Sequence, residues 1–197
     1  YPPCVSCHLF SVKKRNTLCS YCRPDSKQAQ RVKKEEIKVY NALKEEGVIC
    51  QREVRIHYDC MAKNTLKKWS NLDFLIEGKH GRVIVEVDEN QHKDGYPISC
   101  DVSRMNHVIT ALTITDQGRP TTWIRYNPHS YTVDGVKTKT STKERLECLM
   151  SKIRDGMMNS CPGTMVYYMY YDVDSTGYPL VTLDPTYDCS FKKLIKL

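Results

Sequence analysis

The sequence lacks several features that would assign the chain to a special class. It contains no run of about 18 apolar residues, so no segment is expected to cross a membrane. It also lacks the apolar stretch of a secretory signal peptide, and it shows no internal repeat or low-complexity segment. Phe and Trp are scarce, with 3 and 2 copies, whereas Tyr occurs 13 times, which favours half-buried rings with polar tips. What is left is a globular chain of 197 residues, enough for one principal domain with an appendage.

The charge balance is moderately basic. Lys and Arg number 30 against 23 Asp and Glu, which gives a formal net charge of +7. Such an excess is compatible with a polyanionic partner.

Ten cysteines raise the alternative of a secreted disulfide scaffold. Four of them crowd into the first 22 residues, and the other six are scattered singly along the chain. Dense disulfides belong to small secreted folds, whereas this chain is larger and has no recognisable signal peptide. We therefore expect an intracellular, reducing compartment, the nucleus or the cytoplasm.

The most specific local motif is a pair of Cys-x2-Cys knuckles, Cys4 with Cys7 and Cys19 with Cys22, separated by eleven residues. Four thiolates in this arrangement suit a tetrahedral Zn²⁺ ion. A module of residues 1–24 is too short to bury a core, so the metal would be what folds it. The alternatives are two disulfides or thiols without a role.

The zinc module is also basic, which suggests that it contacts DNA, although a merely solvated face would look the same. A second lysine-rich stretch lies in the predicted loop 60–70. The candidate DNA-binding residues in these two segments are Lys13, Lys14, Arg15, Arg23, Lys63, Lys67 and Lys68.

Hydrophobic patterning predicts a mixed α/β domain over residues 25–197. A polar, turn-rich segment is predicted at 128–142, and the tail after residue 173 is hard to assign. The predicted elements are helix 26–46 ended by Gly47, strands 48–58, 71–77 and 83–92, helix 101–112, strand 121–126, helix 143–158 and strand 165–173. This order predicts a mixed β-sheet flanked by helices.

Two of these strands carry acids. Side chains alternate along a strand, so Glu86 and Asp88 share one face with Ile84, while the valines on the opposite face must be buried. An antiparallel hairpin through 78–81 would bring Asp73 across from that pair. Ionised groups in an apolar strand are costly unless they are paired or bound to a metal. Converging carboxylates suit Mg²⁺, and the alternative is an acid at a sheet edge paired with a lysine.

The order of motifs resembles the restriction-endonuclease-like superfamily, and most closely its branch of very-short-patch-repair endonucleases and related homing endonucleases. The motifs that carry the resemblance span about residues 30–130: Asp73-Phe-Leu-Ile, Val85-Glu-Val-Asp-Glu-Asn-Gln-His92, Asp101-x2-Arg104 and Trp123-Ile-Arg-Tyr-Asn127. The superfamily's usual pattern is an Asp followed by Glu-x-Lys on the next strand. Here Asp88 stands where that lysine would be, which favours the branch that uses a histidine.

The resemblance implies a role for each residue of the motif. Asp73 would bind Mg²⁺, and Glu86 and Asp88 would complete or flank the site, with Glu86 favoured as the second ligand. His92 would act on the attacking water, because an imidazole titrates near neutral pH. The branch also carries a helix-borne acid ahead of the strands, a place that Glu36 occupies here.

Two further residues follow from the same motifs. Glu35 is the alternative to the neighbouring Glu36 as the helix-borne acid. Asp101 and Arg104 lie one helical turn apart, where they would orient His92 or hold a phosphate, or simply form a local salt bridge.

The sequence thus predicts a Mg²⁺-dependent DNA endonuclease, site-specific or of the mobile-element (homing) type, with a structural Zn²⁺ site. One alternative is a catalytically inactive nuclease fold that binds DNA through its zinc module and basic surface. A zinc-stapled structural or interaction protein is the third reading, and it leaves the buried acids unexplained.

Overall fold

In the computed structural model the chain divides into two units, residues 1–41 and 42–197. The structure describes residues 2, 4–5, 12–18, 23, 27–58, 68–92, 98–115, 118–158 and 163–187; for 27–33 and 92 it describes the backbone only. The predicted zinc module lies within the first unit, and every strand belongs to the second.

The described elements follow the predicted order. They are α1 (Lys27–Glu45), β1 (Gln51–His57), β2 (Trp69–Glu77), β3 (Arg82–Val87), the 3-10 turn η1 (Glu89–His92), α2 (Ile98–Thr115), β4 (Thr121–Tyr126), β5 (Tyr131–Val133), β6 (Val136–Thr138), α3 (Thr142–Met158), β7 (Thr164–Met169) and the 3-10 turn η2 (Leu180–Leu183). The prediction of a mixed α/β fold with a sheet between helices is confirmed.

The main sheet has the strand order β1-β2-β3-β4-β7. β1, β2 and β3 pair antiparallel, whereas β3, β4 and β7 run parallel. The short strands β5 and β6 form a separate two-stranded sheet. The carboxyl ends of the three parallel strands therefore meet at one edge, which is where open α/β sheets place their ligands.

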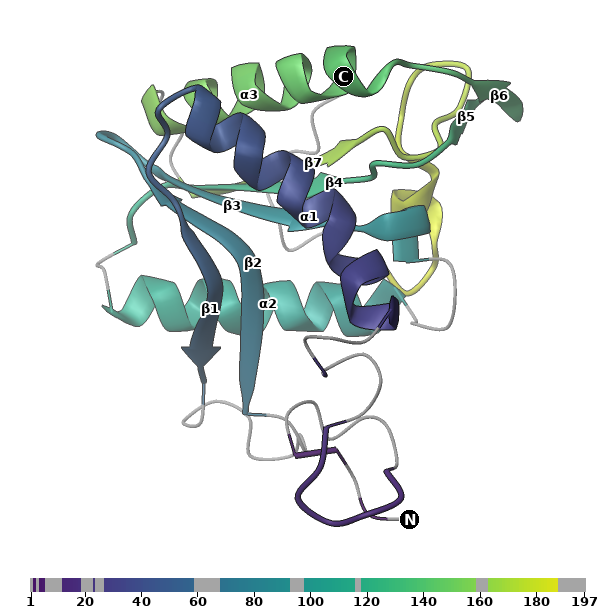
Figure 1. Ribbon diagram of the computed structural model, residues 1–197. Coiled ribbons are helices and arrows are strands. Elements are labelled where there is room, and N and C mark those ends of the chain that lie inside the picture. The colour runs from purple at the N-terminus through teal and green to yellow at the C-terminus, as the bar shows by residue number, and fades with distance from the viewer. Residues whose placement is uncertain are drawn as a thin grey trace. The chain divides into compact units, whose positions relative to one another are not determined.

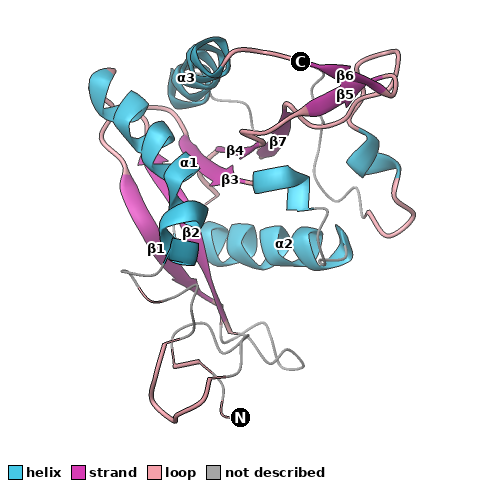
Figure 2. Ribbon diagram, turned by 45° about the vertical axis from the view of Figure 1, so that its right-hand side comes forward, coloured by secondary structure: helices cyan, strands magenta, loops and turns pink. Residues whose placement is uncertain are grey.

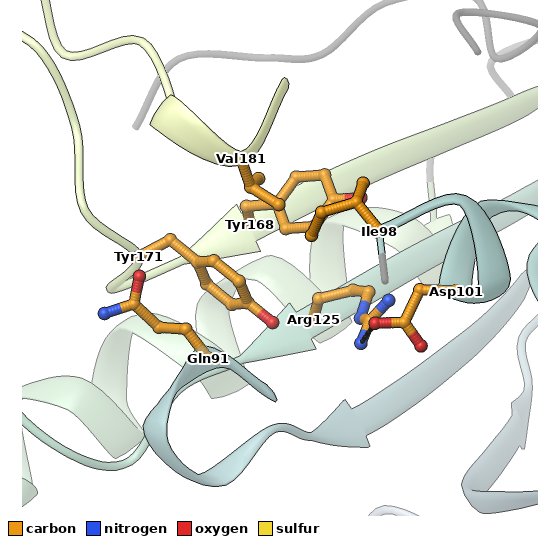
Figure 3. Close-up of a pocket in the computed structure, with 7 residues that line it drawn as sticks. All are labelled: Gln91, Ile98, Asp101, Arg125, Tyr168, Tyr171 and Val181. Carbon is orange, nitrogen blue, oxygen red and sulfur yellow. Dashed lines mark hydrogen bonds and ion pairs between the residues drawn. The ribbon is translucent and has the colours of Figure 1, made fainter. Parts of the chain in front are cut away.

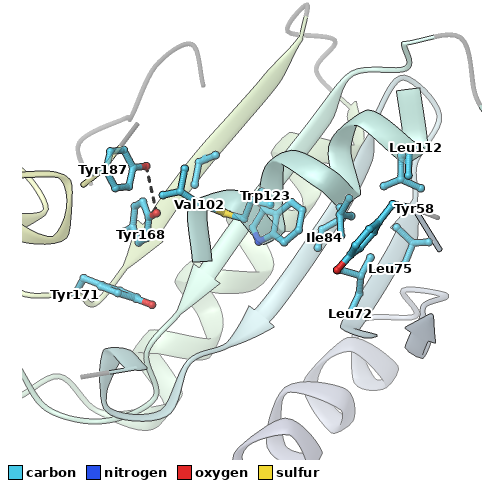
Figure 4. Packing of buried hydrophobic residues seen from close by; sticks show 14 residues of the cluster. Tyr58, Leu72, Leu75, Ile84, Val102, Leu112, Trp123, Tyr168, Tyr171 and Tyr187 are labelled. Carbon is cyan, nitrogen blue, oxygen red and sulfur yellow. Dashed lines mark hydrogen bonds between the residues drawn. The ribbon is translucent and has the colours of Figure 1, made fainter. Parts of the chain in front are cut away.

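Helices α2 and α3 cover opposite faces of the main sheet (Figures 1 and 2). The face under α2 carries a large apolar cluster to which Val102 and Leu112 of the helix and Ile84 and Trp123 of the sheet belong (Figure 4). On the other face α3 approaches closely at Gly156, where a Cβ atom would lie 2.9 Å from Thr122. Both faces of β3 are therefore covered, and all six of its residues are buried.

Helix α1 ends as the sequence predicts. Gly47 adopts a φ of +70°, and the amides of Gly47 and Val48 donate to the carbonyls of Lys44 and Leu43. These two bonds form the glycine-terminated helix cap that satisfies the last free carbonyls. None of the helices in the described part of the chain is long and apolar enough to cross a membrane.

Most predicted boundaries differ from the structure by a few residues, and three differences are larger. β3 ends at Val87 and cannot extend to residue 92, because Asn90 and Gln91 adopt positive φ angles that a strand does not tolerate. β7 ends at Met169 for the same reason, since Tyr170 has a φ of 60°. The segment predicted as polar and irregular contains the β5–β6 hairpin.

Candidate active site

The candidate site lies where β2 separates from β3. The two strands pair only from Phe74 with Val85 to Glu77 with Arg82, after which β2 continues beside β1 and β3 beside β4. Asp73 and Glu86 are the first residues beyond the last pair. The Asp73 carboxylate spans the opening and accepts a 2.8 Å hydrogen bond from the amide of Val87. The predicted antiparallel hairpin is confirmed, and it brings Asp73 to the end of β3. The predicted convergence of Asp73 with both Glu86 and Asp88 is not confirmed, because Asp88 is engaged by Arg125 and Tyr171.

Arg104 of α2 occupies the same opening. Its Nη2 atom lies 2.7 Å from Glu86 Oε1 and 2.8 Å from the carbonyl oxygen of Asn71 on β2. The Glu86 side chain is 4% exposed and that of Arg104 is 24% exposed, so solvent reaches the pair from the arginine side. One cation therefore bridges the two diverging strands and pairs with Glu86, one of the two candidate metal ligands.

The electrostatics of Glu86 are those of a buried acid. Burial raises the pKa of Glu86 above its ordinary value, and Asp88 adds to the rise, while Arg104 and Arg125 oppose it. The pKa of Arg104 is itself raised: burial would lower it, and its pairing with Glu86 outweighs that cost. Glu86 thus depends on a neighbouring cation for its ionised form.

Asp88, two residues further on, sits in a different cluster. Its Oδ2 atom lies 2.5 Å from Nε of Arg125 on β4 and accepts a 2.7 Å hydrogen bond from the hydroxyl of Tyr171. The same guanidinium donates to Asp101 in the first turn of α2, at 3.0 Å. The Asp88 and Arg125 side chains are 1% and 2% exposed. This buried network ties β3, β4, α2 and the segment after β7 together.

The pKa shifts in this cluster reflect tight pairing. Burial would lower the pKa of Arg125, but Asp88, Tyr171 and Asp101 hold it well above its ordinary value. Burial and the charge of Asp88 both raise the pKa of Tyr171 well above its ordinary value, so this hydroxyl stays a donor.

A small pocket opens beside the buried cluster (Figure 3). Tyr171 points its hydroxyl toward Arg125, which lies next to Asp101. The pocket is lined by Gln91, Ile98, Asp101, Arg125, Tyr168, Tyr171 and Val181. Its charged side chains pair with each other and Arg125 is almost fully buried, whereas solvent reaches the pair of Glu86 and Arg104. The opening between β2 and β3 is therefore the stronger candidate for chemistry.

A short strap, residues 88–92, leads from β3 to His92. Asn90 and Gln91 have φ angles of 56° and 58°, a conformation that non-glycine residues adopt at a cost. Gln91 is clamped at both ends of its amide: it donates to Asp172 at 3.1 Å and accepts from the Asp172 backbone amide at 2.9 Å. The strap is thus held in an unusual conformation at the edge of the site, with the backbone of His92 at its end.

The donor chemistry at the opening fits a hard divalent cation. Asp73 and Glu86 present carboxylate oxygens from adjacent strands, and Mg²⁺ is commonly held by one or two carboxylates with water completing its shell. Among the described residues no three His, Cys, Asp or Glu side chains form a group that could hold a metal ion. The side chain of His92 lies outside the described residues.

The other predicted site residues belong to the first unit. Cys4 is buried beside Val12, whereas Cys7, Cys19 and Cys22 lie outside the described residues, so the zinc site stays a prediction. The basic residues of the predicted module for which the structure describes a side chain are exposed, namely Lys13, Lys14, Arg15 and Arg23.

The two candidate helix-borne acids lie on α1. Glu36 is buried, and Glu35 pairs with Lys38 at 2.7 Å. Both stand in the first unit, so their predicted approach to the site also stays a prediction. Of the predicted loop lysines, Lys68 is exposed, while Lys63 and Lys67 lie outside the described residues.

Sequence reasoning missed the partners of the acids. Arg125 lies within the motif Trp123–Asn127, which enters the predictions only through its resemblance to the endonuclease superfamily. Tyr171 and Asp172 lie within the predicted strand 165–173, which gives them no role at the site. A usable signal was present for Arg125, because a charged residue inside the apolar run Thr121–Tyr126 must find a buried counter-charge.

Comparison with known protein families, with curated protein sequences and with solved structures gave no match to this chain.

Proposed function

We propose that this protein is a Mg²⁺-dependent endonuclease that hydrolyses phosphodiester bonds in DNA, built on a restriction-endonuclease-like core. The observation that carries the proposal is the placement of two acids where β2 and β3 separate, near the carboxyl end of β3. Asp73 accepts from the Val87 amide, and Glu86 pairs with Arg104.

Asp73 and Glu86 would hold the metal. When bound there, Mg²⁺ would lower the pKa of a coordinated water and neutralise charge on the phosphate. The hydrogen bond from the Val87 amide orients the Asp73 carboxylate, and Arg104 holds the Glu86 carboxylate in place. In the superfamily pattern the cation of the site is a lysine on β3; here Arg104 of α2 supplies positive charge beside Glu86 instead.

The remaining motif residues take different roles. His92 takes the proton from the attacking water, and the clamped strap fixes the position of its backbone. Asp88 acts as a positioning residue, because its carboxylate is engaged by Arg125 and Tyr171.

Cleavage of supercoiled plasmid tests the proposal. Wild-type protein should nick or linearise the plasmid in Mg²⁺ and not in EDTA, and Asp73→Ala should reduce cutting to background because a metal ligand is lost. His92→Ala should slow cutting by about 10²- to 10⁴-fold, the usual cost of a lost general base. Wild-type cutting by Asp73→Ala would overturn the assignment of the site.

His80 provides a matched control for the histidine. It is exposed in the turn before β3, at the opposite end of that strand from the strap. His80→Ala should cut at the wild-type rate, and only His92→Ala should lose the limb of the pH–rate profile near neutrality. Sequencing the cut ends then tests whether cleavage is site-specific, as the resemblance to homing endonucleases implies.

A catalytically inactive DNA-binding protein is the second candidate. It is favoured by the pairing of Glu86 and Asp88 with arginines, which already neutralises both acids. This candidate predicts DNA binding without cleavage in Mg²⁺, and a binding assay beside the plasmid assay separates the two.

For the first unit we propose a structural Zn²⁺ site formed by the four N-terminal cysteines in a reducing compartment. Buried Cys4 and the hydrogen bond between the Val5 amide and the Thr17 carbonyl support it, because they bring the two knuckle-bearing segments together. We expect about one Zn²⁺ per chain by elemental analysis, lost in Cys19→Ser. Protein purified under reducing conditions without zinc would contradict this proposal.

A further inference from the structure

The β5–β6 hairpin is a feature that the chemistry proposed above does not use. Its two strands are joined by Asp134 and Gly135, whose φ angles of 50° and 75° match the tight Asp-Gly turn that favours hairpins. The hairpin follows the carboxyl end of β4 and stands apart from the main sheet (Figures 1 and 2).

Buried polar side chains anchor the base of the hairpin. Asn127 is fully buried; its amide nitrogen donates to the carbonyl of Tyr170 at 2.8 Å, and its amide oxygen accepts from the His129 amide at 3.0 Å. Asp172 accepts a 2.7 Å hydrogen bond from the Thr132 amide. A buried polar group that is left without a hydrogen bond is costly, so these hydrogen bonds fix the start of the hairpin.

Arg145 of α3 secures the other side of the base. The buried guanidinium donates to the carbonyls of Asn127 and His129, and Nε donates to that of Thr140 at 3.2 Å. It also lies over the rings of Tyr131 and Tyr170, 5.3 Å and 4.8 Å from their centres. One cation thus holds both ends of the hairpin, so the hairpin projects in a defined direction.

The second strand of this anchored hairpin and the residue that follows it are solvated and positively charged. Lys137 and Lys139 are exposed and lie two residues apart, so they project from the same face of β6 and its extension. Within the described part of the chain neither has an ion-pair partner, and Asp134 is the one acid of the hairpin. Val136 is 69% exposed beside them.

The hairpin is also tied to the candidate active site. His129 Nδ1 lies 2.9 Å from Oδ1 of Asn90, the strap residue two positions before His92. Asp172, which holds Thr132 of the hairpin, is the same residue that clamps Gln91 of the strap. The two lysines therefore stand in a fixed relation to the strap.

We propose that the β5–β6 hairpin binds the phosphate backbone of duplex DNA, with Lys137 and Lys139 each neutralising one phosphate. A fixed pair of unpaired cations next to a phosphodiester-cleaving site complements a polyanion, and phosphate contacts of this kind set the position of a protein on the duplex. The inference rests on the proposed function, since it names how the substrate is held.

Salt-dependent DNA binding tests the inference. Affinity for a duplex would be measured by fluorescence anisotropy in Ca²⁺, without Mg²⁺, from about 50 to 200 mM salt. Each lost phosphate contact should reduce the slope of log affinity against log salt by about 0.9, so Lys137→Gln/Lys139→Gln should lose about 1.8. The single variants should each lose about half of that.

Lys79→Gln is the matched control. Lys79 is exposed in the turn before β3, whereas the hairpin follows β4. Because β3 and β4 are parallel, Lys79 and the hairpin lie at opposite ends of these strands. The control should bind with the wild-type slope, and thermal unfolding should show that all variants are folded.

The outcomes separate the two proposals. Wild-type slope and affinity in the double hairpin variant would overturn the role of the hairpin while leaving DNA cleavage intact. A wild-type protein that neither binds nor cuts DNA would overturn the proposed function itself. A double variant that loses affinity for RNA or a protein, but not for duplex DNA, would assign the hairpin to a different partner and also overturn the inference.

Discussion

Glu86 and Asp88 stand two residues apart on one face of the same chain segment, and each pairs with an arginine, yet their surroundings differ. Glu86 meets an arginine from a helix that solvent still reaches, with 24% of the Arg104 side chain exposed. Asp88 meets Arg125 from the neighbouring strand, with both side chains almost fully buried. An acid whose arginine is open to solvent can bind a metal ion in place of that arginine. A buried acid that also accepts a hydrogen bond from a tyrosine hydroxyl would lose more free energy by doing so. We therefore propose that Glu86 binds the metal and that Asp88 has a structural role.

The largest expected effect on the stability of the protein comes from breaking the buried pair of Asp88 and Arg125. Asp88→Ala and Arg125→Met should each lower the free energy of unfolding by about 3–5 kcal/mol, because each leaves an uncompensated buried charge. The double variant Asp88→Leu/Arg125→Met should lose less than the sum of the two. Urea denaturation measures all three.

The exposed pair of Lys143 and Glu147 is the control for that experiment. Its atoms lie 3.9 Å apart and the side chains are 88% and 65% exposed. Glu147→Gln should change stability by less than about 0.5 kcal/mol. Additive losses in the Asp88 and Arg125 variants would show that the two residues do not form one unit.

Glu86→Gln should have a smaller effect on stability and a large effect on cleavage. The amide retains a hydrogen bond to Arg104, whose charge reaches solvent, so we expect a change within about 1 kcal/mol by urea denaturation. Plasmid cleavage should nevertheless be lost, because a neutral amide is a poor ligand for a hard cation. Asp88→Asn should show the reverse, a larger loss of stability with cleavage retained by the folded fraction. The same behaviour in both variants would remove the distinction between the two acids.

Tyr171→Phe should lower the free energy of unfolding by about 1 kcal/mol at neutral pH, because one hydrogen bond to Asp88 is lost. The native state raises the pKa of Tyr171 above its ordinary value of 10.0. Its contribution is therefore fully present below that ordinary value and is lost as the pH rises through the higher native pKa. The stability gap between wild type and variant should narrow when urea denaturation is moved from about pH 8 to about pH 10.5. A gap that widens with pH would contradict the raised pKa.

Much of the fold could be predicted from hydrophobic periodicity. The alternation in β3 predicted Glu86 on one face and the valines on the other, and the turn at 78–81 predicted the antiparallel hairpin of β2 and β3. The β5–β6 hairpin was missed although Asp134-Gly135 is a strong hairpin signal, because its strands are short and their exposed residues do not alternate. The extent of β7 was overestimated because Tyr170 continues an aromatic strand pattern while its backbone turns away.

By itself the sequence determined the order of elements, the buried faces of the central strands and the hairpin that carries Asp73 and Glu86. These features follow from local periodicity and from a short turn, which act over a few residues. Only the tertiary structure decided which cation each acid meets. Arg104 and Arg125 lie 18 and 37 residues from their partners and are brought to them by α2 and by the parallel pairing of β4. A buried charge demands a counter-charge, but its identity depends on which elements pack together, and no local pattern encodes that.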